Sequence, residues 1–151
     1  MSQIKRLEFS IDIKADATKI WKALWSDRGY KAWAAVFYEG SYIVIDKWEE
    51  RSTILFLGAD KSGIYSVIEK YRPSEMIKFK HIGNVKEGVA QPLDSETLEW
   101  SGATEIYQIK RREGFNILQV QLDVMDEHFD FMTKTFPKAL EVIKANSRKV
   151  L

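Results

Sequence analysis

Few residues of this 151-residue sequence have the types and spacing needed for acid–base chemistry. His81 belongs to an alternating run in which Ile77 and Phe79 share its face. Alternation in the preceding run places Glu69 on the expected inward face of that run. A histidine beside a carboxylate can act as a general base, because the carboxylate fixes the tautomer of the ring. We therefore take His81 and Glu69 as the catalytic candidates, with Tyr107 as the alternative partner of His81.

The other histidine, His128, stands beside Asp126, Glu127 and Asp130 at the start of a predicted helix. Acidic residues interact favourably with a helix N-terminus, which explains this group without a bound ion. Two histidines without ligand spacing and no cysteine predict no metal site. Because the sequence also lacks a glycine-rich phosphate loop and a nucleophile elbow, we expect no cofactor.

Charge and composition restrict the classes of partner. The sequence has 23 Lys and Arg against 22 Asp and Glu, a net charge of +1, so no strong field attracts nucleic acid. No stretch reaches the roughly 20 apolar residues of a membrane-spanning helix, which predicts no stable membrane insertion. The absence of cysteine and of an apolar N-terminal signal segment predicts a cytoplasmic protein.

Hydrophobic periodicity predicts the elements that would position these residues. Ile4 to Ile13 alternates as a strand, Asp16 is placed to cap a helix, and Tyr30 to Ala35 favours a second helical turn. Apolar residues at steps of three and four predict a long helix from Asp126 to Val150. Between them lie the β-rich runs 42–48, 53–57, 64–71, 77–82, 103–111 and 115–124.

The segment from Gly83 to Gly102 interrupts this pattern. It is rich in Gly, Glu, Asp and Ser and has Pro92 in its middle. Loops of this length are uncommon in compact domains and are usually functional flaps or disordered segments. The sequence leaves both interpretations open.

Four stretches resemble the START-like, or SRPBCC, superfamily: IKADATKIWKALWS (13–26), SVIEKYRPSEMIKFKH (66–81), WSGATEIYQIKR (100–111) and FPKALEVIK (136–144). The last two are similar to a bacterial branch grouped with homologues of the activator of the ninety-kilodalton heat-shock protein ATPase. The resemblance implies one α+β domain over residues 1–151. Its helix-grip fold would wrap a curved antiparallel sheet of about seven strands around the long C-terminal helix, with two short helices after the first strand.

The resemblance further implies a cavity between the sheet and the C-terminal helix, with polar groups among apolar walls. The candidate lining residues are Trp33, Tyr65, Val67, Glu69, Phe79, His81, Trp100, Tyr107, Phe129, Met132 and Phe136. We expect noncatalytic binding of an apolar or aromatic small molecule there. The alternatives are a chaperone-associated protein, whose partner would be the chaperone, and a cyclase or hydrolase that uses His81. The same side chains could instead be core residues with satisfied hydrogen bonds.

Overall fold

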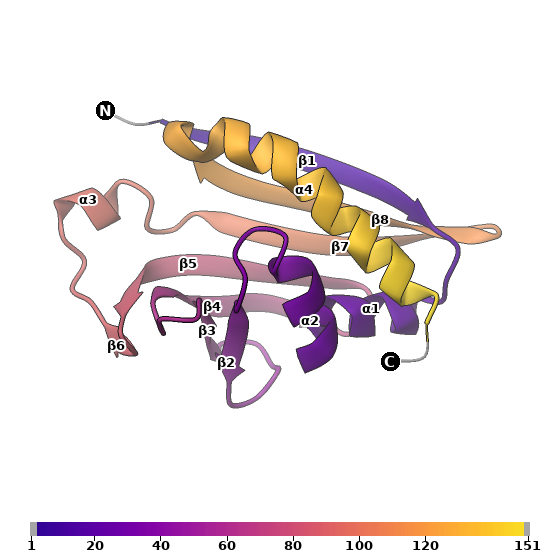
Figure 1. Cartoon of the computed structure of the whole chain (residues 1–151), viewed down its shortest axis with the longest axis horizontal. Coiled ribbons are helices and arrows are strands. Elements are labelled where there is room, and N and C mark those ends of the chain that lie inside the picture. The colour runs from indigo at the N-terminus through magenta and orange to yellow at the C-terminus, as the bar shows by residue number, and fades with distance from the viewer. Residues whose placement is uncertain (1–2, 150–151) are drawn as a thin grey trace.

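The structure is a computed structural model that describes residues 3–149. Eight strands and four helices follow one another along this part of the chain (Figure 1). They are β1 (Ile4–Ile13), α1 (Ala17–Trp25), α2 (Asp27–Ala34), β2 (Tyr42–Ile45), β3 (Thr53–Leu57), β4 (Gly63–Arg72), β5 (Met76–Lys86), β6 (Val89–Ala90), α3 (Ser95–Leu98), β7 (Thr104–Arg112), β8 (Phe115–Met125) and α4 (Asp126–Ser147).

All the strands belong to one antiparallel sheet. Its order is β1-β8-β7-β5-β4-β3-β2, and the two-residue β6 pairs only with β5. The seven strands expected from the sequence are therefore present, and β6 is an addition within the segment Gly83 to Gly102. Short hairpin connections explain the antiparallel pairing, since parallel neighbours need long crossovers.

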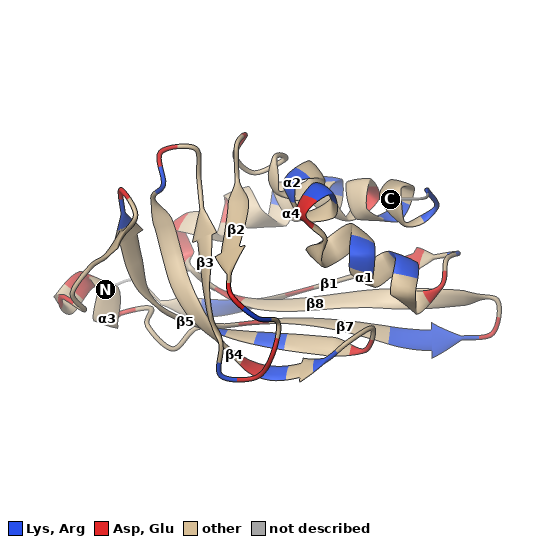
Figure 2. Ribbon diagram, turned by 90° about the horizontal axis from the view of Figure 1, so that it is seen from below, with Lys and Arg blue, Asp and Glu red and all other residues tan. Residues whose placement is uncertain are grey.

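The helices α1, α2 and α4 cover one face of this curved sheet (Figure 2). The long helix α4 packs on α1, α2, β1 and β8 and buries Phe136, Ala139, Leu140 and Ile143 at steps of three and one. This confirms the helix-grip α+β fold. The helix continues through Pro137 to Ser147, and the predicted end at Val150 lies outside the described residues. None of the described helices is long and apolar enough to cross a membrane.

Two details at the short helices differ from the prediction. Asp16 occupies the N-cap position of α1, but its side chain makes no capping hydrogen bond. The second helix begins at Asp27, three residues before the predicted start, because Ser26 caps it: the Ser26 hydroxyl oxygen accepts a hydrogen bond from the Gly29 amide at 3.0 Å.

Strand β4 departs from simple alternation. Its pairing with β5 shifts register between Tyr65 and Ser66 and again between Ile68 and Lys70. Residues opposite each other on paired strands point to the same face of the sheet. A bulge shifts the register and so changes which residues of the two strands are opposite each other. The expectation that Val67 and Glu69 face the helices is therefore wrong.

Ser66 and Ile68 hold the helix-side positions instead. Ser66 is opposite His81 and Ile68 is opposite Phe79, and both are fully buried. Val67 is opposite the exposed Lys80.

Candidate functional site

A chain of four polar side chains crosses three neighbouring strands beneath the helices. On β4, the Ser66 hydroxyl lies 2.6 Å from Nδ1 of His81 on β5. Nε2 of His81 lies 3.1 Å from Oε1 of Glu105 on β7. The other carboxylate oxygen of Glu105 accepts a short hydrogen bond from the Tyr107 hydroxyl. Because an ionised carboxylate only accepts, Nε2 carries a proton, and in the neutral ring Nδ1 accepts from Ser66.

Burial determines the protonation of the tyrosines beside Glu105. Desolvation raises the pKa of Tyr107 well above its usual value, and the charge of Glu105 and the hydrogen bond to it raise it further. Burial likewise raises the pKa of Tyr30, with a smaller contribution from the charge of Glu105. Both side chains are therefore neutral hydrogen-bond donors at neutral pH.

Glu105, not Glu69, is the carboxylate partner of His81. Glu69 forms an ion pair with Lys78 at 3.4 Å. Alternation back from Tyr107 would have placed Glu105 on the correct face, so the signal was present in the sequence. The sequence contained no such signal for Ser66, because residue types do not clearly indicate a bulge that reverses alternation.

The network has the side-chain types of a hydrolase triad but lacks an accessible nucleophile. Ser66 has no exposed surface, and His81 is buried as well. The polar atoms of the network pair with one another, as is typical of a satisfied buried network. Among the described residues, no cluster of three or more His, Asp or Glu side chains could hold a metal ion.

An aromatic pocket of about 120 Å³ opens beside this network. Trp25 forms part of its wall and connects it to the network, since the Trp25 ring lies edge-on at 4.8 Å from the ring of Tyr107. The lining residues come from the α1–α2 junction, from β2 and from the turn after β2: Trp25, Ser26, Asp27, Tyr30, Ile43, Ile45 and Trp48. We call this space the aromatic pocket.

The tight junction between α1 and α2 brings Trp25 and Tyr30 together. A Cβ at Gly29 would come within 2.6 Å of the Ala23 carbonyl oxygen, so only glycine allows this close approach. The rings of Trp25 and Tyr30 then stack with their centroids 6.3 Å apart. Trp48 closes the other side, 5.8 Å from the Trp25 ring.

The Trp25 side chain contains an unpaired buried donor. Its indole Nε1 has no hydrogen-bond partner among the described residues, although the residue is only 7% exposed. The neighbouring Trp33 shows the ordinary outcome, because its indole N–H donates to the Leu24 carbonyl oxygen at 3.0 Å. The sequence interpretation named Trp33 but missed Trp25, Tyr30 and Trp48; only their shared location in three dimensions identifies them.

The predicted lining residues lie in different parts of the structure. Trp33, Phe79, Tyr107 and Phe136 pack in the core, where Phe136 lies 5.0 Å from Phe9 and 6.3 Å from Trp33 between ring centroids. The other predicted positions on α4, Phe129 and Met132, are partly buried.

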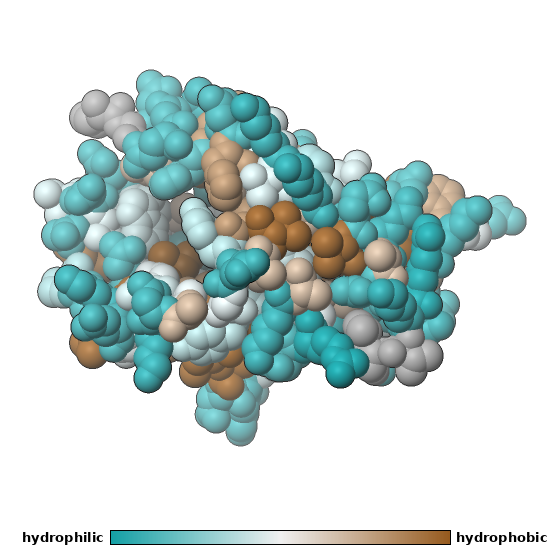
Figure 3. Space-filling model, viewed as in Figure 1, coloured by the Kyte–Doolittle hydropathy of each residue, from teal (hydrophilic) through white to brown (hydrophobic). Residues whose placement is uncertain are grey.

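Beside them, Phe131 on α4 is 40% exposed and contacts Phe37 and Tyr38 after α2. Figure 3 shows hydrophobic side chains gathered between α4 and this segment.

The segment 83–102, which we call the flap, contains regular secondary structure. Strand β5 extends into it as far as Lys86, and β6 and α3 follow. Asp94 caps α3 by accepting from both the amide and the hydroxyl of Thr97, and these hydrogen bonds lower the pKa of the Asp94 carboxyl. Tyr65 lies against this region, since a Cβ at Gly83 would come within 2.7 Å of the Tyr65 ring. Trp100 is half-buried at the end of the flap.

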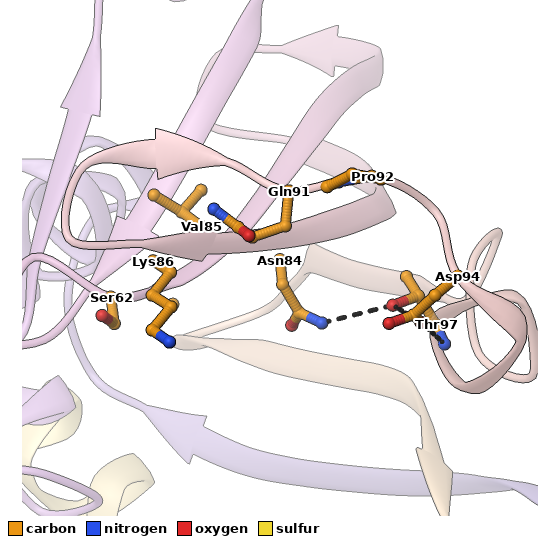
Figure 4. A pocket seen from close by; sticks show the side chains of 9 residues that line it. Ser62, Asn84, Val85, Lys86, Gln91, Pro92, Asp94 and Thr97 are labelled. Atoms are coloured by element: carbon orange, nitrogen blue, oxygen red, sulfur yellow. Dashed lines mark hydrogen bonds between the residues drawn. The ribbon is translucent and has the colours of Figure 1, made fainter.

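A wider cleft of about 490 Å³ lies between this flap and the ends of β4 and β5. Figure 4 shows Val85 and Gln91 on one side of β5, and Ser62, Lys86 and Asn84 on the other. Asn84 extends toward Thr97 at 3.4 Å. Polar side chains line the cleft alongside the apolar Val85 and Pro92.

Comparisons with solved structures find the same architecture in several proteins. The Aha1 dimer structure from Colwellia psychrerythraea is 22% identical, covers 93% of each chain and has a TM-score of 0.64. Protein MLL2253 from Mesorhizobium loti is 8% identical over 97% of this chain and 100% of its own, with a TM-score of 0.72. CalU16 from Micromonospora echinospora is 12% identical over 98% of this chain and 83% of its own, with a TM-score of 0.64. No protein-family model and no curated protein matches the sequence. Together with the observed sheet and helices, these likenesses show that the chain has the helix-grip fold that the sequence resemblance implied.

Proposed function

We propose that this protein binds a small aromatic molecule without catalysis, in the aromatic pocket between the α1–α2 junction and β2. The observation that carries the proposal is the wall of three aromatic rings, Trp25, Tyr30 and Trp48, around an open volume. Apolar walls with a few polar groups are the usual chemistry of a small-molecule site. The expected ligand class is unchanged from the sequence prediction, but its position moves from the interface of sheet and α4 to the helix junction.

The volume limits the size of the bound group. A cavity of about 120 Å³ is comparable to one that accepts a single benzene ring. Burying at most about 150 Å² of apolar ring surface contributes up to about 4 kcal/mol at 25 cal/mol per Å². The cost of association reduces this gain, so we expect a dissociation constant of about 1 mM or weaker. Titration followed by NMR is therefore the suitable measurement, since it detects weak binding at individual residues.

Toluene is a suitable probe, with two variants of neighbouring β2 residues. Ile43 lines the pocket, whereas Val44 points to the other face of the strand and is 45% exposed. Replacing Ile43 with Trp should fill the pocket, and Val44→Trp should leave it open. We expect saturable shifts of the Trp25 and Trp48 indole signals in wild type and in Val44→Trp, and their loss in Ile43→Trp. Absence of binding to wild type, or equal binding by both variants, would contradict the proposal.

A catalytic function is the second candidate, because His81 and Glu105 form a pair competent for proton transfer. Complete burial of Ser66 opposes a covalent mechanism, so such an enzyme would need His81 to reach a substrate through the partly exposed Glu105. A panel of aryl esters tests it: turnover by wild type that Glu105→Gln abolishes would support catalysis. The chaperone association implied by the sequence resemblance would instead appear as capture of a heat-shock ATPase from lysate.

A further inference from the structure

Strand β1 forms a long edge of the sheet that is paired on one side alone. It pairs with β8 along its whole length, from Ile4 opposite Met125 to Ile13 opposite Asn116. In the described part of the chain, no strand pairs with its other side. The backbone amide and carbonyl groups that point outward from β1 are therefore available to pair with another chain.

This edge lacks most of the features that protect natural sheet edges. Such edges are usually short, contain a proline or a bulge, or are covered by another element. Strand β1 has ten residues, contains neither Pro nor Gly, and pairs with β8 without a register shift. The strand at the opposite edge, β2, has four residues. In Figure 1, α4 lies over the start of β1 and then crosses toward α1, away from this edge.

The side chains of β1 determine which partner the edge accepts. Its odd-numbered residues from Leu7 to Ile13 face the helices. The exposed residues on its other face include Arg6, Glu8, Ser10 and Asp12. Charged side chains usually discourage pairing at an edge, but these charges have both signs. A strand with both signs can pair with a copy of itself when each charge meets its opposite.

The register centred on Phe9 meets this condition. When two copies of β1 pair antiparallel about this residue, Arg6 of one copy lies opposite Asp12 of the other. The central pairs on the helix side are then apolar, with Leu7 opposite Ile11 and Phe9 opposite itself. This register covers residues 5–13 without placing two like charges opposite each other.

The neighbouring registers are less favourable. A register centred on Glu8 would bring two copies of this glutamate together, and one centred on Ser10 would place Glu8 opposite Asp12. Like charges directly opposite each other are destabilising. A register centred on Leu7 avoids such pairs but covers only residues 4–10.

The charges of the existing contacts agree with this pairing. Asp12 forms no ion pair within the described part of the chain. Arg6 contacts Asp123 at 2.9 Å and Thr104 at 3.2 Å across the sheet. Its side chain is still partly exposed, so its positive charge can attract Asp12 of a second copy without losing these contacts.

We propose that this chain forms a symmetric dimer in which the β1 strands of two copies pair antiparallel about Phe9 and join the two sheets. The twofold axis uses the same edge of both copies, so the assembly closes at two copies. This inference is independent of the aromatic pocket, which lies beside β2 at the opposite edge of the sheet.

Sedimentation velocity over a range of protein concentrations tests the dimer. We expect a reversible dimer in the wild type. Asp12→Lys puts a second positive charge opposite Arg6 at both symmetric positions and should weaken the dimer about tenfold. The matched control, Glu39→Lys, makes the same change of charge at an exposed residue between α2 and β2 and should leave the dimer unchanged.

Disulfide formation identifies the register, because the sequence contains no cysteine. Two variants, Glu8→Cys and Ser10→Cys, are purified separately, mixed and oxidised, and mass spectrometry then distinguishes the products. Opposite residues on paired strands are close enough for a disulfide. We expect the mixed disulfide between the two variants to form faster than the symmetric disulfide of either one.

Four outcomes would overturn the inference. They are a wild-type protein that stays monomeric up to about 1 mM, assemblies that keep growing beyond two copies, a dimer that Asp12→Lys leaves unchanged, and a symmetric disulfide that forms faster than the mixed one. If Asp12→Lys does not fold, the concentration dependence of the wild type and the disulfide pattern decide the question.

Discussion

Ser66 and His81 lie directly opposite each other on β4 and β5, with Oγ of the serine 2.6 Å from Nδ1 of the imidazole. The irregularity after Tyr65 sets this pairing, because the register passes from Tyr65 opposite Gly83 to Ser66 opposite His81 and leaves Ile82 on β5 without an opposite residue. The hydrogen bond satisfies a ring nitrogen that the core removes from water. Stability therefore depends on a serine that no sequence motif distinguishes.

Replacing Ser66 with Ala should destabilise the protein by about 1–3 kcal/mol, because Nδ1 of His81 would stay buried without a partner. Urea unfolding measures this loss. The control is Ser10→Ala on the exposed face of β1, which should change stability by less than about 0.5 kcal/mol. Equal effects of the two substitutions would show that the hydrogen bond contributes nothing.

The bulged register of β4 can be tested by two neighbouring substitutions. Ile68→Ala should cost about 2–5 kcal/mol, because Ile68 is fully buried opposite Phe79. Val67→Ala should cost less than about 1 kcal/mol, because Val67 is only partly buried on the other face. A larger loss of stability for Val67→Ala than for Ile68→Ala in chemical denaturation would support regular alternation along β4 and contradict the bulged register.

Helix α4 offers a matched pair of phenylalanines. Phe136 is 1% exposed and stacks on Phe9, so Phe136→Ala should cost about 3–5 kcal/mol. Phe131 lies on the exposed side of the same helix, so Phe131→Ala should lower the free energy of unfolding by clearly less than Phe136→Ala. A loss below about 0.5 kcal/mol for Phe136→Ala in urea unfolding would mean that α4 does not dock as described.

Alkaline pH should weaken the fold through its buried tyrosines. Burial raises the pKa of Tyr107 and Tyr30 in the folded state. Above about pH 10 the unfolded chain loses these protons while the folded chain keeps them, so stability is complete below pH 10 and falls as pH rises. At its steepest, the free energy of unfolding falls by about 1.4 kcal/mol per pH unit for each tyrosine.

Urea unfolding at several pH values between 9 and 11.5 measures this slope. Tyr107→Phe removes one of the two groups and should make the decline less steep. The exposed Tyr38 supplies the control substitution, Tyr38→Phe. A decline with the same slope in Tyr107→Phe as in wild type would show that Tyr107 is not responsible.

The sequence alone determined the architecture. Alternation in residues 4–13, the short breaks between β-rich runs and the apolar spacing of Phe136, Leu140 and Ile143 are local patterns, and each local pattern agreed with the fold. The resemblance to START-like proteins predicted the same order of elements. Core residues such as Phe79 and Tyr107 followed from the same periodicity, because a buried face must be apolar along its whole length.

The candidate site depended on tertiary structure. Two register shifts between β4 and β5 put Ser66 and Ile68, rather than Val67 and Glu69, opposite His81 and Phe79. Glu105 reached His81 because β7 pairs with β5 across 24 residues of sequence. A side chain's partner is set by strand register and by the packing of neighbouring elements, which residue types specify only weakly. The aromatic pocket shows the same dependence. Trp25, Tyr30 and Trp48 are ordinary core candidates in the sequence, and only the packing of the α1–α2 junction against β2 leaves a space between them.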